Sequence, residues 1–136
     1  MPHPALDTRV LTELDHVRID RLLSRSPRQP DERLHALLDL ADIVPPQRVP
    51  ADVVTMYTQV SVEDTCDGTR RKLAVCYPED AEPGAGFVSV LSPIGTALLG
   101  CRRGETVEWA TPAGDVRCLR IVELLFQPEA SGDFTL

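Results

Sequence analysis

The chain has 136 residues, a length that suits one ordinary domain or one small domain with an appendage. Hydrophobic residues make up 43% of it, which excludes global disorder, and the formal net charge of −7 disfavours binding to a phosphate backbone over the whole surface. No apolar stretch approaches the roughly 20 residues of a membrane-spanning helix, and the N-terminus lacks a secretion signal, so we expect a cytoplasmic protein with no membrane contact.

The glycines divide the chain in two. All eight lie at or beyond Gly68, which predicts a helical first half and a second half rich in turns and strands. Pro45, Pro46 and Pro50 form a stiff connector between the halves. The expected organisation is α+β, with a helical unit over residues 1–50 and a sheet domain over residues 51–136.

The first predicted helix begins at Thr12, whose hydroxyl can cap it, with Asp15 at the third helical position, and it runs to about Leu23. Residues 25–30 then break the helix. A second helix is expected near Pro30, where Asp31 and Glu32 suit the positive end of the helix dipole. Its apolar stripe consists of Leu34, Leu37, Leu38 and Ala41. Two helices with a short loop predict an antiparallel hairpin.

The second half predicts an antiparallel sheet. Alternating apolar positions indicate strands over 58–64, 72–77, 87–91, 105–110 and 116–126. Asp67-Gly68 is typical of a hairpin turn between the first two strands. Residues 92–100 predict one short helix laid against the sheet: Ser92 caps it, Pro93 takes the first position and Gly100 supplies the left-handed exit.

Residues able to bind metals or act as nucleophiles are sparse. Cys66, Cys76, Cys101 and Cys118 are expected to be reduced thiols, mostly buried in strands. His16 and His35 could face each other across the hairpin, but no histidine has metal-ligand spacing, so we expect neither a metal nor another cofactor.

Motifs for catalysis and nucleic-acid binding are also missing. The sequence contains no serine-hydrolase, dinucleotide-binding or P-loop motif. The basic runs 70–72 and 102–103 lack aromatic neighbours for base stacking, which favours a solvated face or a partner contact. Asp31 and Glu32 could bind Mg²⁺ as paired carboxylates, although helix-dipole compensation also explains them.

One series of residues resembles a known family. Ser92-Pro-Ile-Gly95, Ala97-Leu-Leu-Gly100, Gly104-Glu105 and Thr111-Pro-Ala-Gly114 are similar to the C-terminal domain of the GreA/GreB transcript-cleavage factors. Residues 52–56 and 127–133 look like those of the regulators of nucleoside diphosphate kinase (Rnk), the short-armed relatives of the Gre factors. The resemblance implies an FKBP-like sheet domain behind an N-terminal coiled coil, and binding at the rim of the RNA polymerase secondary channel.

In the Gre factors, acidic residues at the coiled-coil tip hold a catalytic Mg²⁺. Here the corresponding tip, Arg25-Ser-Pro-Arg28, contains no acid, and helices of about 12 residues span only roughly 18 Å. We therefore expect a regulator that is not an enzyme: it binds RNA polymerase, competes with Gre factors without stimulating cleavage, and meets DNA or RNA only through polymerase. The alternatives are a direct regulator of nucleoside diphosphate kinase, a weak prolyl isomerase, or a cleavage factor that uses Asp31 and Glu32.

The expected partner-binding residues are Leu91, Ser92, Pro93, Ile94 and Gly95, which match the Gre loop that touches the polymerase rim. A Ser-Pro helix start is pre-organised, so docking costs it little conformational entropy. Leu91 and Ile94 are the candidate anchors if they are exposed. Alternatively, the two side chains only seat the short helix on the sheet.

Overall fold

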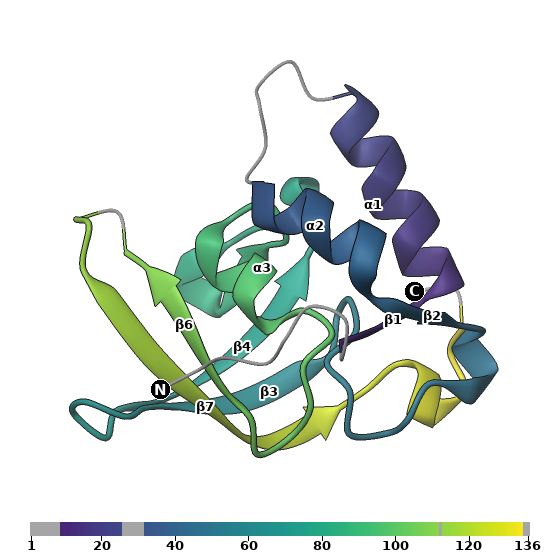
Figure 1. The fold of residues 1–136 in the computed structure, drawn as a ribbon. Coiled ribbons are helices and arrows are strands. Elements are labelled where there is room, and N and C mark those ends of the chain that lie inside the picture. Colours follow the sequence, from purple (N-terminus) through teal and green to yellow (C-terminus); the bar gives the residue numbers. More distant parts are fainter. Residues whose placement is uncertain (1–8, 26–31, 112, 135–136) are drawn as a thin grey trace.

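The computed structural model describes residues 9–25, 32–111 and 113–134, and it has the predicted α+β architecture (Figure 1). A curled sheet forms the lower part of the molecule in this view, and two helices from the first half lie beside it. Among the described residues, no helix is long and apolar enough to span a membrane.

Both predicted helices of the first half are present. Helix α1 covers Glu13–Arg25, and its start is capped as expected, since the backbone N–H of Asp15 donates to Thr12 Oγ1 at 3.1 Å. Helix α2 covers Glu32–Leu40 and buries its predicted leucine stripe. His16 Nε2 lies 3.0 Å from the Leu38 carbonyl oxygen, which ties the two helices together. Asp31 and residues 26–28 of the predicted tip lie outside the described residues.

The strands lie close to their predicted positions. The five-stranded sheet has the order β5-β4-β3-β7-β6. Its strands are β3 (Gln59–Asp64), β4 (Arg70–Cys76), β5 (Phe87–Ser89), β6 (Thr106–Ala110) and β7 (Val116–Phe126). The expected turn at Asp67-Gly68 joins β3 to β4, with Gly68 at a φ of +76°. Residues directly opposite each other on these strands share a face of the sheet.

One prediction about the sheet is wrong: it is not wholly antiparallel. Strand β5 pairs with β4 in parallel, with Val75 opposite Val88. The connection over residues 77–86 contains two short 3₁₀ turns, Pro78–Asp80 and Pro83–Ala85, which carry the chain back so that it re-enters the sheet in the same direction. Alternating apolar residues indicate a strand but do not specify the direction of its neighbour.

A small parallel pair was not predicted. Strands β1 (Val10–Thr12) and β2 (Asp42–Val44) flank the two helices and pair with each other.

Helix α3 (Pro93–Leu98) packs against the sheet, and the hydrophobic core is one cluster that includes residues of α1, α2, α3 and the sheet. The first half therefore packs on the second half.

The cysteines fit the expectation only in part. Cys76 is buried in β4 and Cys118 is partly buried in β7, but Cys101 is buried just after α3 and Cys66 is exposed in the β3–β4 turn. All four are free thiols. Burial raises the pKa of Cys101 to about 12, so this thiol stays protonated and unreactive at neutral pH.

Candidate functional site

The turn over residues 91–95 is organised by Ser92. Its hydroxyl oxygen accepts a hydrogen bond from the backbone N–H of Gly95 at 3.2 Å and donates one to the Ser89 carbonyl oxygen at 2.6 Å. Pro93 occupies the first helical turn, as predicted. The backbone N–H of Leu91 donates to Ser89 Oγ at 3.1 Å. These bonds hold the turn in one conformation, so little ordering remains to be done when a partner docks.

Gly95 is required for packing rather than for contact with a partner. A Cβ atom added there would lie 2.1 Å from the carbonyl oxygen of Ser89, a distance that real Cβ atoms do not show. The glycine lets α3 approach the end of β5 closely. Any larger residue would push the helix off the sheet.

The five predicted contact residues differ in accessibility. Pro93 is exposed, and Leu91 and Ser92 are partly buried. Ile94 is only 6% exposed and Gly95 is buried, so these two seat the helix. The surface that a partner can reach on this turn is therefore formed by Leu91, Ser92 and Pro93.

The other end of α3 is held by Arg9, a residue outside the predicted contact site. Its Nη1 donates to the Thr96 carbonyl oxygen at 2.9 Å and to the Leu99 carbonyl oxygen at 3.4 Å, and the residue is only 3% exposed. A cation beside the last carbonyls of a helix satisfies them and suits the helix dipole. No sequence signal marks Arg9, because its partners lie about 90 residues away.

Asp15 of α1 lies where that helix meets the sheet domain. Its carboxylate accepts a hydrogen bond from the backbone N–H of Met56 at 3.2 Å, and the residue is 2% exposed. Burial raises the pKa of this carboxyl to about 7, more than the Met56 hydrogen bond lowers it. Nearby, the rings of Tyr57 and Tyr77 lie 5.9 Å apart, and the Tyr57 hydroxyl donates to Asp80.

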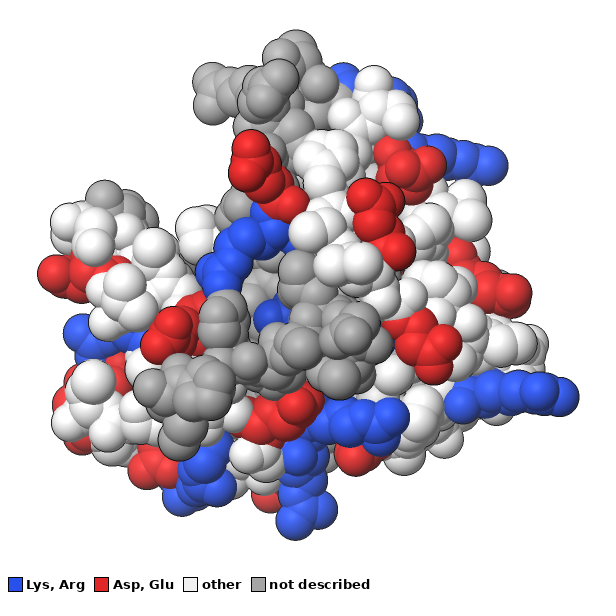
Figure 2. All heavy atoms as spheres, viewed as in Figure 1, with Lys and Arg blue, Asp and Glu red and all other residues white. Residues whose placement is uncertain are grey.

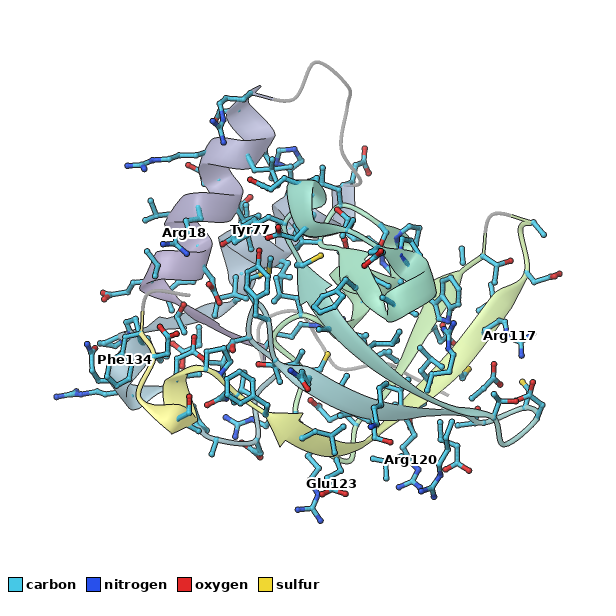
Figure 3. All side chains as sticks on the ribbon, turned by 180° about the vertical axis from the view of Figure 1, so that it is seen from behind. Arg18, Tyr77, Arg117, Arg120, Glu123 and Phe134 are labelled. Carbon is cyan, nitrogen blue, oxygen red and sulfur yellow. The ribbon has the colours of Figure 1, made fainter. Side chains whose placement is uncertain are left out.

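Charges are mixed over the surface. On the face in Figure 2, acidic and basic side chains are interspersed, without a broad basic area. Figure 3 shows the opposite face, with Arg18 of α1 at one side of the molecule and Arg117 of β7 at the other. No group of three or more potential metal ligands occurs in the described ranges. Arg70 and Arg120 lie on one face of the sheet, where both approach Glu63, at 3.9 and 3.0 Å.

Comparisons with known proteins place these features in a family. Residues 49–125, more than half of the chain, match the family described as "Transcription elongation factor, GreA/GreB, C-term". The chain is 37% identical over 132 residues to the Escherichia coli K12 protein named "Regulator of nucleoside diphosphate kinase", and the match covers 95% of this chain and 97% of that protein. It is also 30% identical over 83 residues to transcription elongation factor GreA of Desulfovibrio desulfuricans, and this match covers 51% of that protein.

A solved structure agrees. The chain superposes on a GreA/GreB elongation factor from Nitrosomonas europaea with a TM-score of 0.74 and 33% sequence identity, which covers 88% of this chain and 98% of that one. The resemblance that the sequence carried over residues 92–114 is thereby confirmed. The family match over residues 49–125 contains the whole turn over residues 91–95 and the large sheet except the last residue of β7.

Proposed function

Because this chain belongs to the GreA/GreB family of transcription elongation factors, we propose that it is a non-catalytic regulator that binds bacterial RNA polymerase near the secondary channel. It competes there with Gre factors and does not stimulate transcript cleavage. The observation that carries this proposal is the combination of a matched sheet domain with short helices. Residues 49–125 match the family, whereas α1 and α2 have 13 and 9 residues within the described part of the chain.

Two finer descriptions of the fold belong to the same proposal. The five-stranded sheet that curls around one short helix supports an FKBP-like domain. The helices α1 and α2, joined through His16 and Leu38, support a short coiled-coil arm. At 1.5 Å per residue, α1 is roughly 20 Å long, which limits its reach into a channel.

The contact with polymerase is proposed at Leu91, Ser92 and Pro93, supported from below by Ile94 and Gly95. Replacing Leu91 with Ser or Pro93 with Ala should each weaken polymerase binding by at least ~1 kcal/mol, because each removes part of a pre-organised apolar contact. The melting temperature should stay nearly unchanged for Pro93→Ala and fall for Leu91→Ser, because Leu91 also packs against the hydrophobic core. Binding is therefore compared at a temperature where each variant is folded. Pro83→Ala is the matched control, since Pro83 begins an exposed 3₁₀ turn elsewhere in the sheet domain. Equal binding by all three variants would place the contact elsewhere.

Backtracked polymerase complexes test the rest of the proposal. The protein should release no 3′ RNA fragment, and in excess it should reduce cleavage stimulated by a Gre factor. Mg²⁺-dependent cleavage that disappears in an Asp31→Ala/Glu32→Ala double variant would contradict the proposal and favour the cleavage-factor alternative.

A second candidate function is direct regulation of nucleoside diphosphate kinase. It is favoured by the name of the E. coli relative, which matches 95% of this chain. Parallel pull-downs with purified polymerase and purified kinase distinguish the two candidates. Prolyl isomerisation has less support, because a fold does not establish an activity and aromatic residues make up only 4% of the chain.

A further inference from the structure

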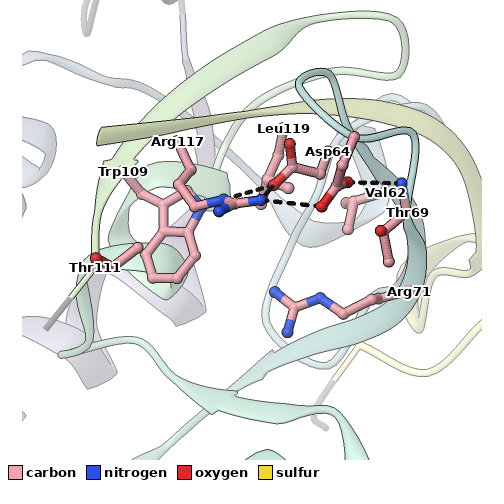
Figure 4. Close-up of a pocket in the computed structure, with 9 residues that line it drawn as sticks. Val62, Asp64, Thr69, Arg71, Trp109, Thr111, Arg117 and Leu119 are labelled. Carbon is pink, nitrogen blue, oxygen red and sulfur yellow. Dashed lines mark hydrogen bonds and ion pairs between the residues drawn. The ribbon is translucent and has the colours of Figure 1, made fainter. Parts of the chain in front are cut away.

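A pocket of about 270 Å³ opens at one end of the inner face of the sheet (Figure 4). Its apolar wall consists of Val62, Leu119 and the ring of Trp109, which come from β3, β7 and β6. Figure 3 shows Arg117, which also lines it, on the side of the molecule away from Arg18 of α1. The pocket is therefore separate from the helices, and none of the residues 91–95 lines it.

The two carboxylates of this pocket already accept hydrogen bonds from the protein itself. Asp64 accepts hydrogen bonds from the backbone N–H of Cys66 at 2.8 Å and from Arg117 Nε at 2.7 Å. Asp67 accepts from the backbone N–H of Thr69 at 2.9 Å and from Arg117 Nη2 at 3.2 Å. The backbone hydrogen bonds lower the pKa of both carboxyls most. The next cause is Arg117 for Asp64 and the Thr69 hydroxyl for Asp67, so both carboxyls stay ionised at neutral pH.

Three donor groups of the pocket, by contrast, have no hydrogen-bond partner among the described residues. Trp109 Nε1 is buried, and no hydrogen-bond acceptor is found for it among the described residues. The Thr111 hydroxyl at the same pocket is buried and unpaired as well. Arg71 of β4 has no ion pair or hydrogen bond within the described part of the chain, and Figure 4 shows its guanidinium directed into the pocket. A buried donor without an acceptor costs about 1–3 kcal/mol, so it calls for an explanation.

We propose that this pocket binds a single carboxylate. Arg71 and Trp109 Nε1 donate hydrogen bonds to it, and the apolar wall contacts the carbon atoms attached to it. The lining holds two carboxylates, Asp64 and Asp67, and two arginines; Arg117 pairs with both carboxylates, which leaves Arg71 as the cation for a ligand of one negative charge. A phosphate would bring nearly two negative charges beside Asp64 and Asp67 and suits the site less well. The pocket lies below the roughly 300–1,000 Å³ of sites for drug-sized ligands, so the ligand is an acidic side chain or a small free acid.

Trp109 makes the proposal directly measurable, because it is the only tryptophan in the chain. Its indole N–H contributes one resonance to a ¹H–¹⁵N spectrum of the full-length protein. Four probes are titrated: acetyl-Gly-Glu-Gly-amide, the same peptide with Gln, sodium succinate, and inorganic phosphate. The resonance should shift saturably with the Glu peptide, with succinate, or with both, and not with the Gln peptide or phosphate. A response to the Glu peptide alone identifies a protein side chain as the source, and a response to succinate alone identifies a free acid.

Two neighbouring arginines provide the matched variants. Arg71→Gln should weaken binding roughly tenfold or more, the loss expected for one charge-assisted hydrogen bond. Arg70→Gln removes the same charge from the preceding residue of β4, where the side chain approaches Glu63 instead, and should bind as the parent does. Trp109→Phe should also weaken binding, and it tests the second donor independently of Arg71. Because this variant lacks the indole resonance, its binding is measured by calorimetry.

Three results would overturn the proposal. The first is no saturable shift with either carboxylate. The second is an equal response to phosphate, and the third is equal weakening by Arg70→Gln and Arg71→Gln. None of these results depends on polymerase binding, so the proposed function is tested separately.

Discussion

Asp15 is an acidic residue in an environment that disfavours its charge. It is 2% exposed, and burial raises its pKa from 3.8 to about 7. At a pH between these two pKa values, the unfolded chain has released the proton of Asp15, whereas the folded chain still holds it. The contribution of Asp15 to the free energy of unfolding is therefore largest below pH 3.8, and it falls as the pH rises to about 7.

Asp15→Asn should remove this pH dependence. The amide oxygen can still accept from the Met56 N–H, but the side chain no longer ionises. We expect the melting temperature of the variant to vary less than that of the parent between about pH 4 and 7, and to be higher at pH 8. Asp20→Asn, an exposed change on the same helix, should keep the pH profile of the parent. Parallel profiles for the parent and Asp15→Asn would show that Asp15 is ionised throughout.

At the scale of elements, α3 depends on contacts at both of its ends. A helix of six residues is too short to persist by itself in water. Ser92 caps its start, Gly95 allows its close approach to β5, and Arg9 binds the carbonyls at its end. The turn over residues 91–95 is thus only as well ordered as the helix that these three residues hold.

Arg9→Met should destabilise the protein by about 1.5–3 kcal/mol, because hydrogen bonds from a charged group are lost and the Thr96 carbonyl is left without its partner. Methionine keeps much of the aliphatic packing, so the loss measures mainly the polar contact. Urea unfolding gives the change in the free energy of unfolding, and Arg48→Met, at an exposed position, is the control. Identical unfolding midpoints for the two variants would mean that Arg9 does not stabilise α3.

At the scale of the whole molecule, the two halves share one core. Leu11, Ile19, Leu34 and Leu37 belong to the same cluster as the apolar residues of the sheet. The backbone N–H of Val10 also donates to the Gly100 carbonyl oxygen at 3.1 Å. The boundary at residues 50/51 therefore remains a prediction about folding rather than a visible separation.

A truncated chain tests this boundary. Residues 51–136 contain the whole large sheet and α3, so we expect them to unfold cooperatively by themselves. Their melting temperature should be lower than that of the full chain, because removing the first half exposes the apolar residues it covers. Residues 1–50 alone should be only marginally helical by circular dichroism. A 51–136 fragment without a cooperative transition would show that the halves fold only together.

Sequence by itself determined where the local elements lie. The Thr12 cap, the leucine stripe of α2, the Asp67-Gly68 turn and the Ser92-Pro93 helix start each depend on residues within a few positions of one another. The motifs over residues 92–114 likewise identified the family from the sequence. Local hydrogen bonds and periodicity were sufficient for these features.

Only the tertiary structure decided the features that join distant segments. The parallel pairing of β5, the β1–β2 pair and the contact of Arg9 with α3 link residues far apart in the chain. The burial of Ile94 and the pocket that brings Arg71 and Trp109 together depend on which faces meet. Periodicity assigns a side chain to a face of its own element, but the partner of that face is set by packing among all the elements at once.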